Sequence, residues 1–175
     1  TNLINFSDKI FAIFKQEASF YKRRGGNVSW VGHPMIDLTK KLPSKKVSRT
    51  ILKLRENQNI LLLMPASRPQ ELKYILPTFL KTAKKLQLRD PSLVVYIPSC
   101  RRVFDEKLRK ALEKYEIKGK VISQKDYELM PYIYSLAKLA LCKSGTVNME
   151  LALYGIPQII GCLLYTSDAA DDTDS

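Results

Sequence analysis

The sequence predicts an α/β protein with a doubly wound, Rossmann-like parallel sheet. Two continuous apolar runs, "ILLLM" at 60–64 and "LVVYI" at 93–97, are typical of strands that are buried on both faces. Segments with helical periodicity alternate with these and with shorter apolar stretches. Each crossover is long enough for a right-handed βαβ unit, so we expect helices on both faces of one sheet.

The first part of the chain predicts short elements. We expect a strand at 10–14, a short helix at 17–22 and a second short strand within "NVSWVGHP". A surface helix is expected from Ser44, its N-cap, to about Leu54. The apolar residues expected on one face of that helix are Val47, Ile51 and Leu54.

The remaining elements follow the strand at 60–64. Pro69 suits the first turn of a helix, where a missing N–H is tolerated. We expect Pro77 to break or kink that helix near Leu76. The later expected elements are, in chain order, a strand at 93–97, a helix at 102–115, a strand at 120–122, a helix at 127–137, a strand at 139–142, a helix at 144–154 and a strand at 158–160.

The charge balance is strongly basic. Lys and Arg number 29 against 17 Asp and Glu, for a net charge of +12. Such a surface favours nucleic acid, an anionic membrane or a phosphorylated substrate, although a solvated basic surface without a particular partner explains it as well. The basic residues are spread out and carry no aromatic RNA-binding signature, so we expect no nucleic-acid partner. The three cysteines lack metal or disulfide spacing, and the sequence contains neither a Walker loop nor a GxGxxG motif. We expect neither a metal nor a cofactor.

Two polar turns follow predicted strands. Pro65-Ala66-Ser67-Arg68 supplies a hydroxyl and a guanidinium, and Arg binds phosphate oxygens well. Ser144-Gly145-Thr146 opens a helix, where free N–H groups attract anions and glycine allows close approach of a ligand. Because ligands bind beyond the carboxyl ends of strands in such sheets, we expect both turns to face one crevice.

Glu150 completes the candidate site. It lies six residues after Ser144, about 9 Å along a helix axis, which is roughly the reach from a diphosphate to a ribose. A carboxylate there can accept hydrogen bonds from ribose hydroxyls. Alternatively, Ser144 is a helix cap, Gly145 a tight turn and Glu150 a solvent-facing acid. The pairing of two polar turns in one sheet favours the nucleotide site.

Three further residues are weaker candidates for ligand contact: Ala66, Met130 and His33. His33 is the single histidine and precedes Pro34, which indicates a structural role in a turn. No second histidine or cysteine lies near it, so a metal site is not expected. Met130 and the tyrosines around it fit a helix packing face better than a cofactor site.

Three motifs resemble those of GT-B glycosyltransferases, and in particular the lipid-A-disaccharide synthase family. They are "VGHPMID" (31–37), "LLLMPASRPQE" (61–71) and "YELMPYIYSLAKLALCKSGTVNMELALYGIP" (127–157). The sequence departs from the family pattern at Ala66, where Gly is usual, and at Lys15-Gln16, where Pro-Phe precedes Glu. The resemblance implies the C-terminal, donor-binding domain of a GT-B fold, in truncated form.

The resemblance also implies an activity. Members transfer 2,3-diacylglucosamine from its UDP donor to 2,3-diacylglucosamine 1-phosphate and release UDP, without a metal, at the cytoplasmic face of the inner membrane. Carried over by position, Ser67 and Arg68 meet the diphosphate, Ser144, Gly145 and Thr146 hold phosphate, and Glu150 holds the ribose. The catalytic base belongs to the family's N-terminal half, so no catalytic residue is expected in this chain. The partners implied are UDP-diacylglucosamine, diacylglucosamine 1-phosphate and an anionic membrane surface.

We divide the chain into three parts. Residues 1–30 are expected to end the N-terminal domain, and 31–161 to form an incomplete UDP-sugar-binding domain. Residues 162–175 look like a translated sequencing-adapter end and are expected to be disordered. Two rival functions remain open: another GT-B enzyme acting on UDP-sugars, such as a UDP-GlcNAc 2-epimerase or a peptidoglycan N-acetylglucosaminyltransferase, and a non-enzymatic basic binding domain.

Overall fold

The computed structural model describes residues 2–39, 41–65 and 68–162. The chain divides into two compact units, Thr1–Lys41 and Leu42–Ser175. Within the described ranges, no helix has the length and apolar character needed to cross a membrane.

The first unit is a small βαβ arrangement. Strands β1 (Ile10–Ala12) and β2 (Val28–Trp30) pair in parallel, and helix α2 (Lys15–Lys22) connects them. The predicted strand, helix and strand are confirmed, although the strands are shorter than expected. The unit also contains α1 (Asn2–Phe6) and α3 (Pro34–Leu38).

The second unit contains one five-stranded parallel sheet with the strand order β5-β4-β3-β6-β7. Its α-helices and strands are α4 (Lys45–Leu52), β3 (Asn59–Met64), α5 (Pro69–Arg89), β4 (Leu93–Pro98), α6 (Asp105–Lys114), β5 (Gly119–Ile122), α7 (Met130–Leu136), β6 (Ala137–Lys143), α8 (Val147–Leu153) and β7 (Gln158–Gly161). Two 3₁₀ helices, η1 (Arg102–Phe104) and η2 (Gln124–Leu129), precede α6 and α7. The predicted doubly wound α/β fold is confirmed.

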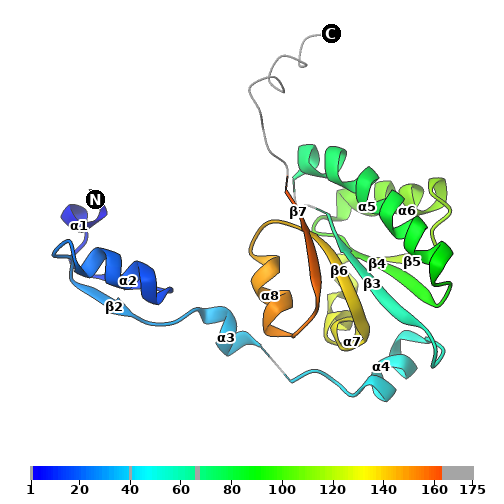
Figure 1. The fold of residues 1–175 in the computed structure, drawn as a ribbon, viewed down its shortest axis with the longest axis horizontal. Helices are drawn as coiled ribbons and strands as arrows, with labels where there is room; N and C mark the ends of the chain where they lie inside the picture. The colour runs from blue at the N-terminus through cyan, green and yellow to red at the C-terminus, as the bar shows by residue number, and fades with distance from the viewer. Residues whose placement is uncertain (1, 40, 66–67, 163–175) are drawn as a thin grey trace, which may run out of the picture. The chain divides into compact units, whose positions relative to one another are not determined.

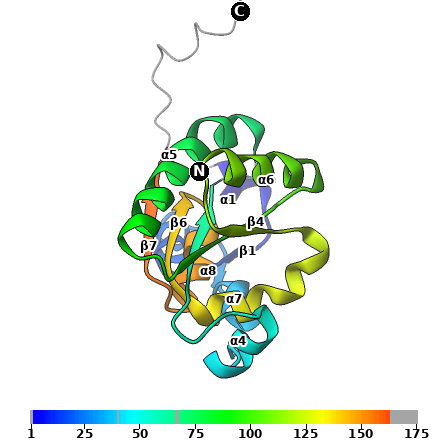
Figure 2. The same cartoon turned by 90° about the vertical axis from the view of Figure 1, so that its right-hand side faces the viewer.

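Helices cover both faces of this sheet (Figures 1 and 2). Leu61 and Leu63 of β3 pack with α5 and α6, whereas Ile60 and Leu62 pack with α4, α7 and α8. All four side chains are fully buried. Alternate residues of one strand thus enter two separate apolar layers, which is why its sequence is a continuous apolar run.

The strand order reverses beside β3. The chain builds β4 and β5 on one side of β3 and then returns to build β6 and β7 on the other side. Met64, the last residue of β3, pairs with Cys142 near the end of β6. In sheets of this type, the crevice at such a reversal is the usual place for a ligand.

Two helices differ in detail from what the residue pattern suggests. The expected break at Pro77 is absent, since helix α5 continues from Pro69 to Arg89 with Pro77 inside it. Leu72 and Leu76 before the proline and Leu80 after it are all buried on the sheet, and this packing holds the helix together. In α4, Ser48 and Leu52 are buried, whereas Val47 and Ile51 are exposed.

The inner face of α4 is set by a polar contact that the apolar pattern does not indicate. The Ser48 hydroxyl donates to the Ser44 carbonyl and accepts a hydrogen bond from the Ser135 hydroxyl of α7. The expected cap is confirmed, since the Ser44 hydroxyl accepts from the Val47 N–H.

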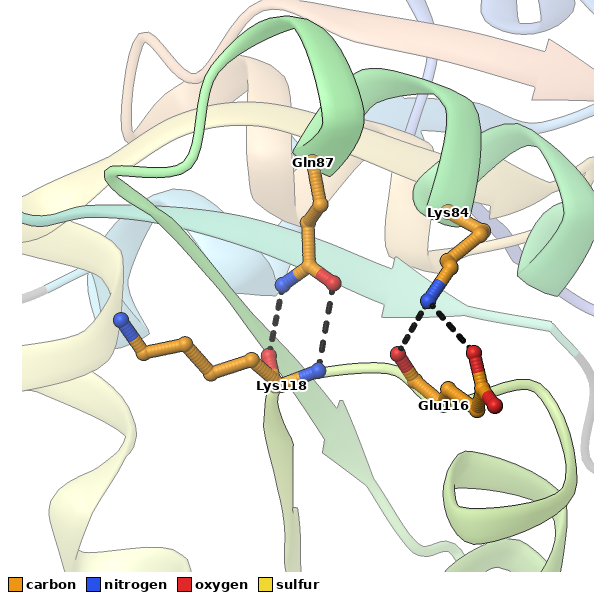
Figure 3. Close-up of polar contacts among 4 residues, drawn as sticks. All are labelled: Lys84, Gln87, Glu116 and Lys118. Carbon is orange, nitrogen blue, oxygen red and sulfur yellow. Dashed lines mark hydrogen bonds and ion pairs between the residues drawn. The ribbon is translucent and has the colours of Figure 1, made fainter.

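Helix α5 is tied to the start of β5 by side chains near its C-terminal end (Figure 3). The Gln87 amide donates to the Lys118 carbonyl at 2.7 Å and accepts from the Lys118 N–H at 3.2 Å. One turn earlier, Lys84 donates to the Glu116 carbonyl and pairs with its carboxylate at 3.2 Å. These contacts satisfy backbone groups at the point where the edge strand begins.

Candidate functional site

A cavity of about 210 Å³ opens at the carboxyl ends of three adjacent strands. Residues from the ends of β3, β4 and β6 line it, together with the turn that leads into α8. The lining residues are Met64, Pro65, Pro98, Cys100, Lys143, Ser144, Gly145, Thr146 and Val147. The cavity therefore lies where the strand order reverses.

The Ser144-Gly145-Thr146 turn forms one wall of the cavity, as the sequence suggested. A Cβ added to Gly145 would meet no atom within 4 Å, so this wall faces open space. Helix α8 begins only at Val147, and no side chain caps it at Thr146. Ser144 is therefore not the cap of this helix.

The expectation of free N–H groups at this turn was wrong for Ser144 and Gly145. The Ser144 N–H binds the Gly161 carbonyl at 3.1 Å, and the Gly145 N–H binds Oδ1 of Asn148 at 2.7 Å. The hydroxyls of Ser144 and Thr146 are the polar groups that this turn offers to a ligand, and both residues are exposed.

The cavity has a cationic character. Lys143 is the one charged residue among the described residues that line it, and no carboxylate is among them. A lysine and two hydroxyl-bearing residues in one lining suit an anionic group such as a phosphate. The site thus has the right chemistry for the phosphates of a nucleotide.

The structure describes part of the first polar turn. Pro65 lines the cavity, while Ala66 and Ser67 lie outside the described residues. Arg68 is the N-cap residue of α5, with an extended backbone and an exposed side chain. It lies three residues after Pro65 but is not among the residues that line the cavity.

Glu150 lies one helical turn beyond the cavity wall. Residues three or four apart share a face of a helix, and Thr146 and Val147 both line the cavity. The Glu150 carboxylate accepts a hydrogen bond of 3.0 Å from the Tyr134 hydroxyl of α7. Burial, and then the Glu150 carboxylate, raise the pKa of Tyr134 well above its ordinary value, so Tyr134 stays a proton donor at neutral pH.

The two weaker candidates that the structure describes occupy other surroundings. Met130 is buried in the apolar layer that contains α7 and α8. His33 belongs to the first unit, where its Nδ1 accepts from the Met35 N–H at 3.2 Å and caps α3. Its ring lies 5.6 Å from that of Phe14.

Sequence reasoning missed several residues of the cavity, including Pro98, Cys100 and Lys143. Each one ends or follows a predicted strand, and this position is the signal that could have identified them. Burial raises the pKa of the Cys100 thiol. Burial also raises the pKa of the neighbouring Tyr127 to about 12. In the described part of the chain, no three metal-ligating side chains come together.

The family model for lipid-A-disaccharide synthetase matches residues 1–169. The chain belongs to this family. A lipid-A-disaccharide synthase of Prochlorococcus marinus is 50% identical over 162 residues, which cover 92% of this chain and 41% of that protein. One from Gloeothece citriformis is 35% identical over 159 residues, covering 91% of this chain and 40% of that protein. The chain thus spans about 40% of the length of these family members.

Solved structures support the fold assignment. Anabaena HepE, in complex with UDP and glucose, matches with a TM-score of 0.54 at 18% identity, over 90% of this chain and 45% of that chain. The wall teichoic acid polymerase TagF matches with a TM-score of 0.56 at 16% identity, over 96% of this chain and 40% of that chain. This chain therefore has the Rossmann-like α/β fold found in GT-B glycosyltransferases, as the sequence predicted.

Proposed function

We propose that this chain is the donor-binding part of a lipid-A-disaccharide synthase. The whole protein would transfer 2,3-diacylglucosamine from its UDP donor to 2,3-diacylglucosamine 1-phosphate and release UDP. The single observation that carries this proposal is the cavity at the strand-order reversal, lined by Lys143 and the Ser144–Thr146 turn. Its position and its positive charge suit the diphosphate of a UDP-sugar.

The proposed roles follow from the chemistry of each side chain. Lys143 and the hydroxyls of Ser144 and Thr146 bind the diphosphate, and Arg68 approaches it from the start of α5. Positive charge at this point stabilises the negative charge that develops on departing UDP, so the chemistry does not require a metal. Glu150 accepts hydrogen bonds from the ribose hydroxyls. We assign no catalytic residue within this chain.

We further propose that the whole protein works at the cytoplasmic surface of an anionic membrane, because donor and acceptor are both acylated. Helix α4 offers one suitable surface. Val47 and Ile51 are 49% and 47% exposed, and the exposed residues Lys45, Lys46 and Lys53 lie near them. Basic residues beside exposed apolar ones favour an anionic lipid surface. Co-sedimentation with phosphatidylglycerol vesicles but not with phosphatidylcholine vesicles would support this placement.

A nucleotide titration tests the proposed site. UDP should raise the melting temperature of the chain more than ADP at equal concentration, because only the uracil nucleotide matches the donor. Lys143→Ala should remove most of the UDP effect, whereas Lys138→Ala, on the same strand but outside the cavity lining, should not. Equal shifts with UDP and ADP would favour the non-enzymatic basic binding domain.

A further inference from the structure

The side-chain amides of Asn148 and Gln158 form a hydrogen-bond network behind the turn that lines the cavity. Asn148 Nδ2 of α8 donates to Oε1 of Gln158, at the start of β7, at 3.0 Å. Gln158 Nε2 in turn donates to the Asn148 carbonyl at 2.9 Å. On its other side, Asn148 Oδ1 accepts from the Gly145 N–H at 2.7 Å. Neither amide was singled out in the sequence.

The orientation of both amides is determined by this network. Asn148 Oδ1 faces an N–H donor, so Nδ2 must face the acceptor on Gln158, and Gln158 Nε2 then faces a carbonyl. Reversing either amide would bring two donors or two acceptors together. The buried Cys142 thiol extends the network, because it lies 3.0 Å from Asn148 Nδ2 and 3.3 Å from Gln158 Oε1.

This network acts on the site through Gly145. The Gly145 peptide lies between Ser144 and Thr146, whose hydroxyls the turn offers to the cavity. The Gly145 Cβ position is open, so no side-chain packing holds this peptide on the cavity side. Gly145 is held by two hydrogen bonds to Asn148, one from its own N–H to the Asn148 side chain and one from the Asn148 N–H to its carbonyl at 3.1 Å. Gln158 in turn orients the Asn148 side chain.

We propose that Asn148 and Gln158 are positioning residues for a nucleoside diphosphate, which act by fixing the Ser144–Thr146 turn. This inference rests on the proposed function, since it assigns the turn to the diphosphate. Asn148 does not line the cavity, so its effect on a ligand passes through the turn. Binding of the phosphates should therefore depend on Asn148, whereas binding of the nucleoside should not.

The test compares UDP with uridine on the 175-residue chain and its variants. Asn148→Ala should lower UDP affinity about tenfold and leave uridine affinity unchanged, as measured by calorimetry for UDP and by chemical-shift titration for uridine. Gln158→Ala should reduce UDP affinity less, because the bond between Asn148 and Gly145 remains. The double variant should be no worse than Asn148→Ala, because the two residues act in one network.

The remaining outcomes distinguish failure of this inference from failure of the proposed function. Unchanged UDP affinity in Asn148→Ala, or equal loss of UDP and uridine in a folded variant, would overturn the inference and leave the proposed function standing. Failure of the unaltered chain to prefer UDP over ADP would instead overturn the proposed function. If Asn148→Ala does not fold, Gln158→Ala decides the question: a selective loss of UDP affinity supports the inference, and an unchanged ratio of UDP to uridine affinity rejects it.

Discussion

Tyr134 and Glu150 are joined by a hydrogen bond of 3.0 Å between the tyrosine hydroxyl and the carboxylate, which links α7 to α8. Tyr134 is buried, and its ring centroid lies 5.0 Å from that of Tyr154. A packed phenol therefore holds the carboxylate one helical turn from the cavity wall. This hydrogen bond uses Oε1 of Glu150, and the role proposed for this residue assigns its other carboxylate oxygen to a ribose hydroxyl.

The first prediction concerns ribose selectivity. Glu150→Gln should weaken UDP binding by about 1.5–3 kcal/mol, because it loses charge-assisted hydrogen bonds to the ribose. The variant should also lose much of the preference for UDP over 2′-deoxy-UDP, measured by calorimetric titration. Glu113→Gln, on the exposed surface of α6, is the matched control and should change neither value. Unfolding of Glu150→Gln, with no ribose preference in the unaltered chain, would show that Glu150 is structural.

The second prediction compares alanine substitutions at two glycines, Gly145 and Gly119. Gly145→Ala should leave the melting temperature unchanged, because the new methyl group would meet no atom within 4 Å and φ is not positive. It should weaken UDP binding, since the methyl group enters the space proposed for the diphosphate. Gly119→Ala should instead lower the free energy of unfolding by about 1–3 kcal/mol, because its Cβ would lie 2.7 Å from the Val95 carbonyl oxygen. Unaltered UDP affinity in Gly145→Ala would place the diphosphate elsewhere.

The third prediction concerns the junction between α5 and β5. Gln87→Ala should lower the free energy of unfolding by about 0.5–1.5 kcal/mol, because it removes two side-chain hydrogen bonds to Lys118. The loss is limited because these contacts are exposed to water and the Lys118 carbonyl still accepts from the Val95 N–H. Lys84→Ala should lower the free energy of unfolding by less than about 1 kcal/mol, because the Glu116 side chain is 84% exposed and the ion pair is screened by water. Urea unfolding followed by circular dichroism measures both values. A larger loss from Lys84→Ala would contradict this ranking.

The fourth prediction concerns alkaline pH. Burial raises the pKa of Tyr96 to about 12, and its hydroxyl has no hydrogen-bond partner among the described residues. The unfolded chain would release this proton near pH 10 and the folded chain only near pH 12, so stability should fall as pH rises through that window. Tyr96→Phe should be neutral or slightly stabilising at pH 7, because it removes a buried, unpartnered hydroxyl. It should also reduce the alkaline loss in melting temperature. An equally steep loss in the variant would assign the effect to other groups.

The sequence by itself determined the parallel sheet and the place of the candidate site. The apolar run at 60–64 can be buried only between two helical layers, and polar turns at strand ends must meet at one edge of a parallel sheet. These features are local in sequence, so the residue pattern is enough to predict them. The family motifs then indicated a nucleotide at that edge.

Only the tertiary structure decided which groups of the turn are available to a ligand. The Gly145 N–H is taken by Asn148, and Asn148 is held by Gln158 ten residues further along the chain. The bond from Tyr134 to Glu150 likewise joins two helices. Such contacts depend on how the elements pack, and neither helical periodicity nor strand alternation contains that information. The continuity of α5 through Pro77 has the same origin, because burial on the sheet outweighs the local preference of proline.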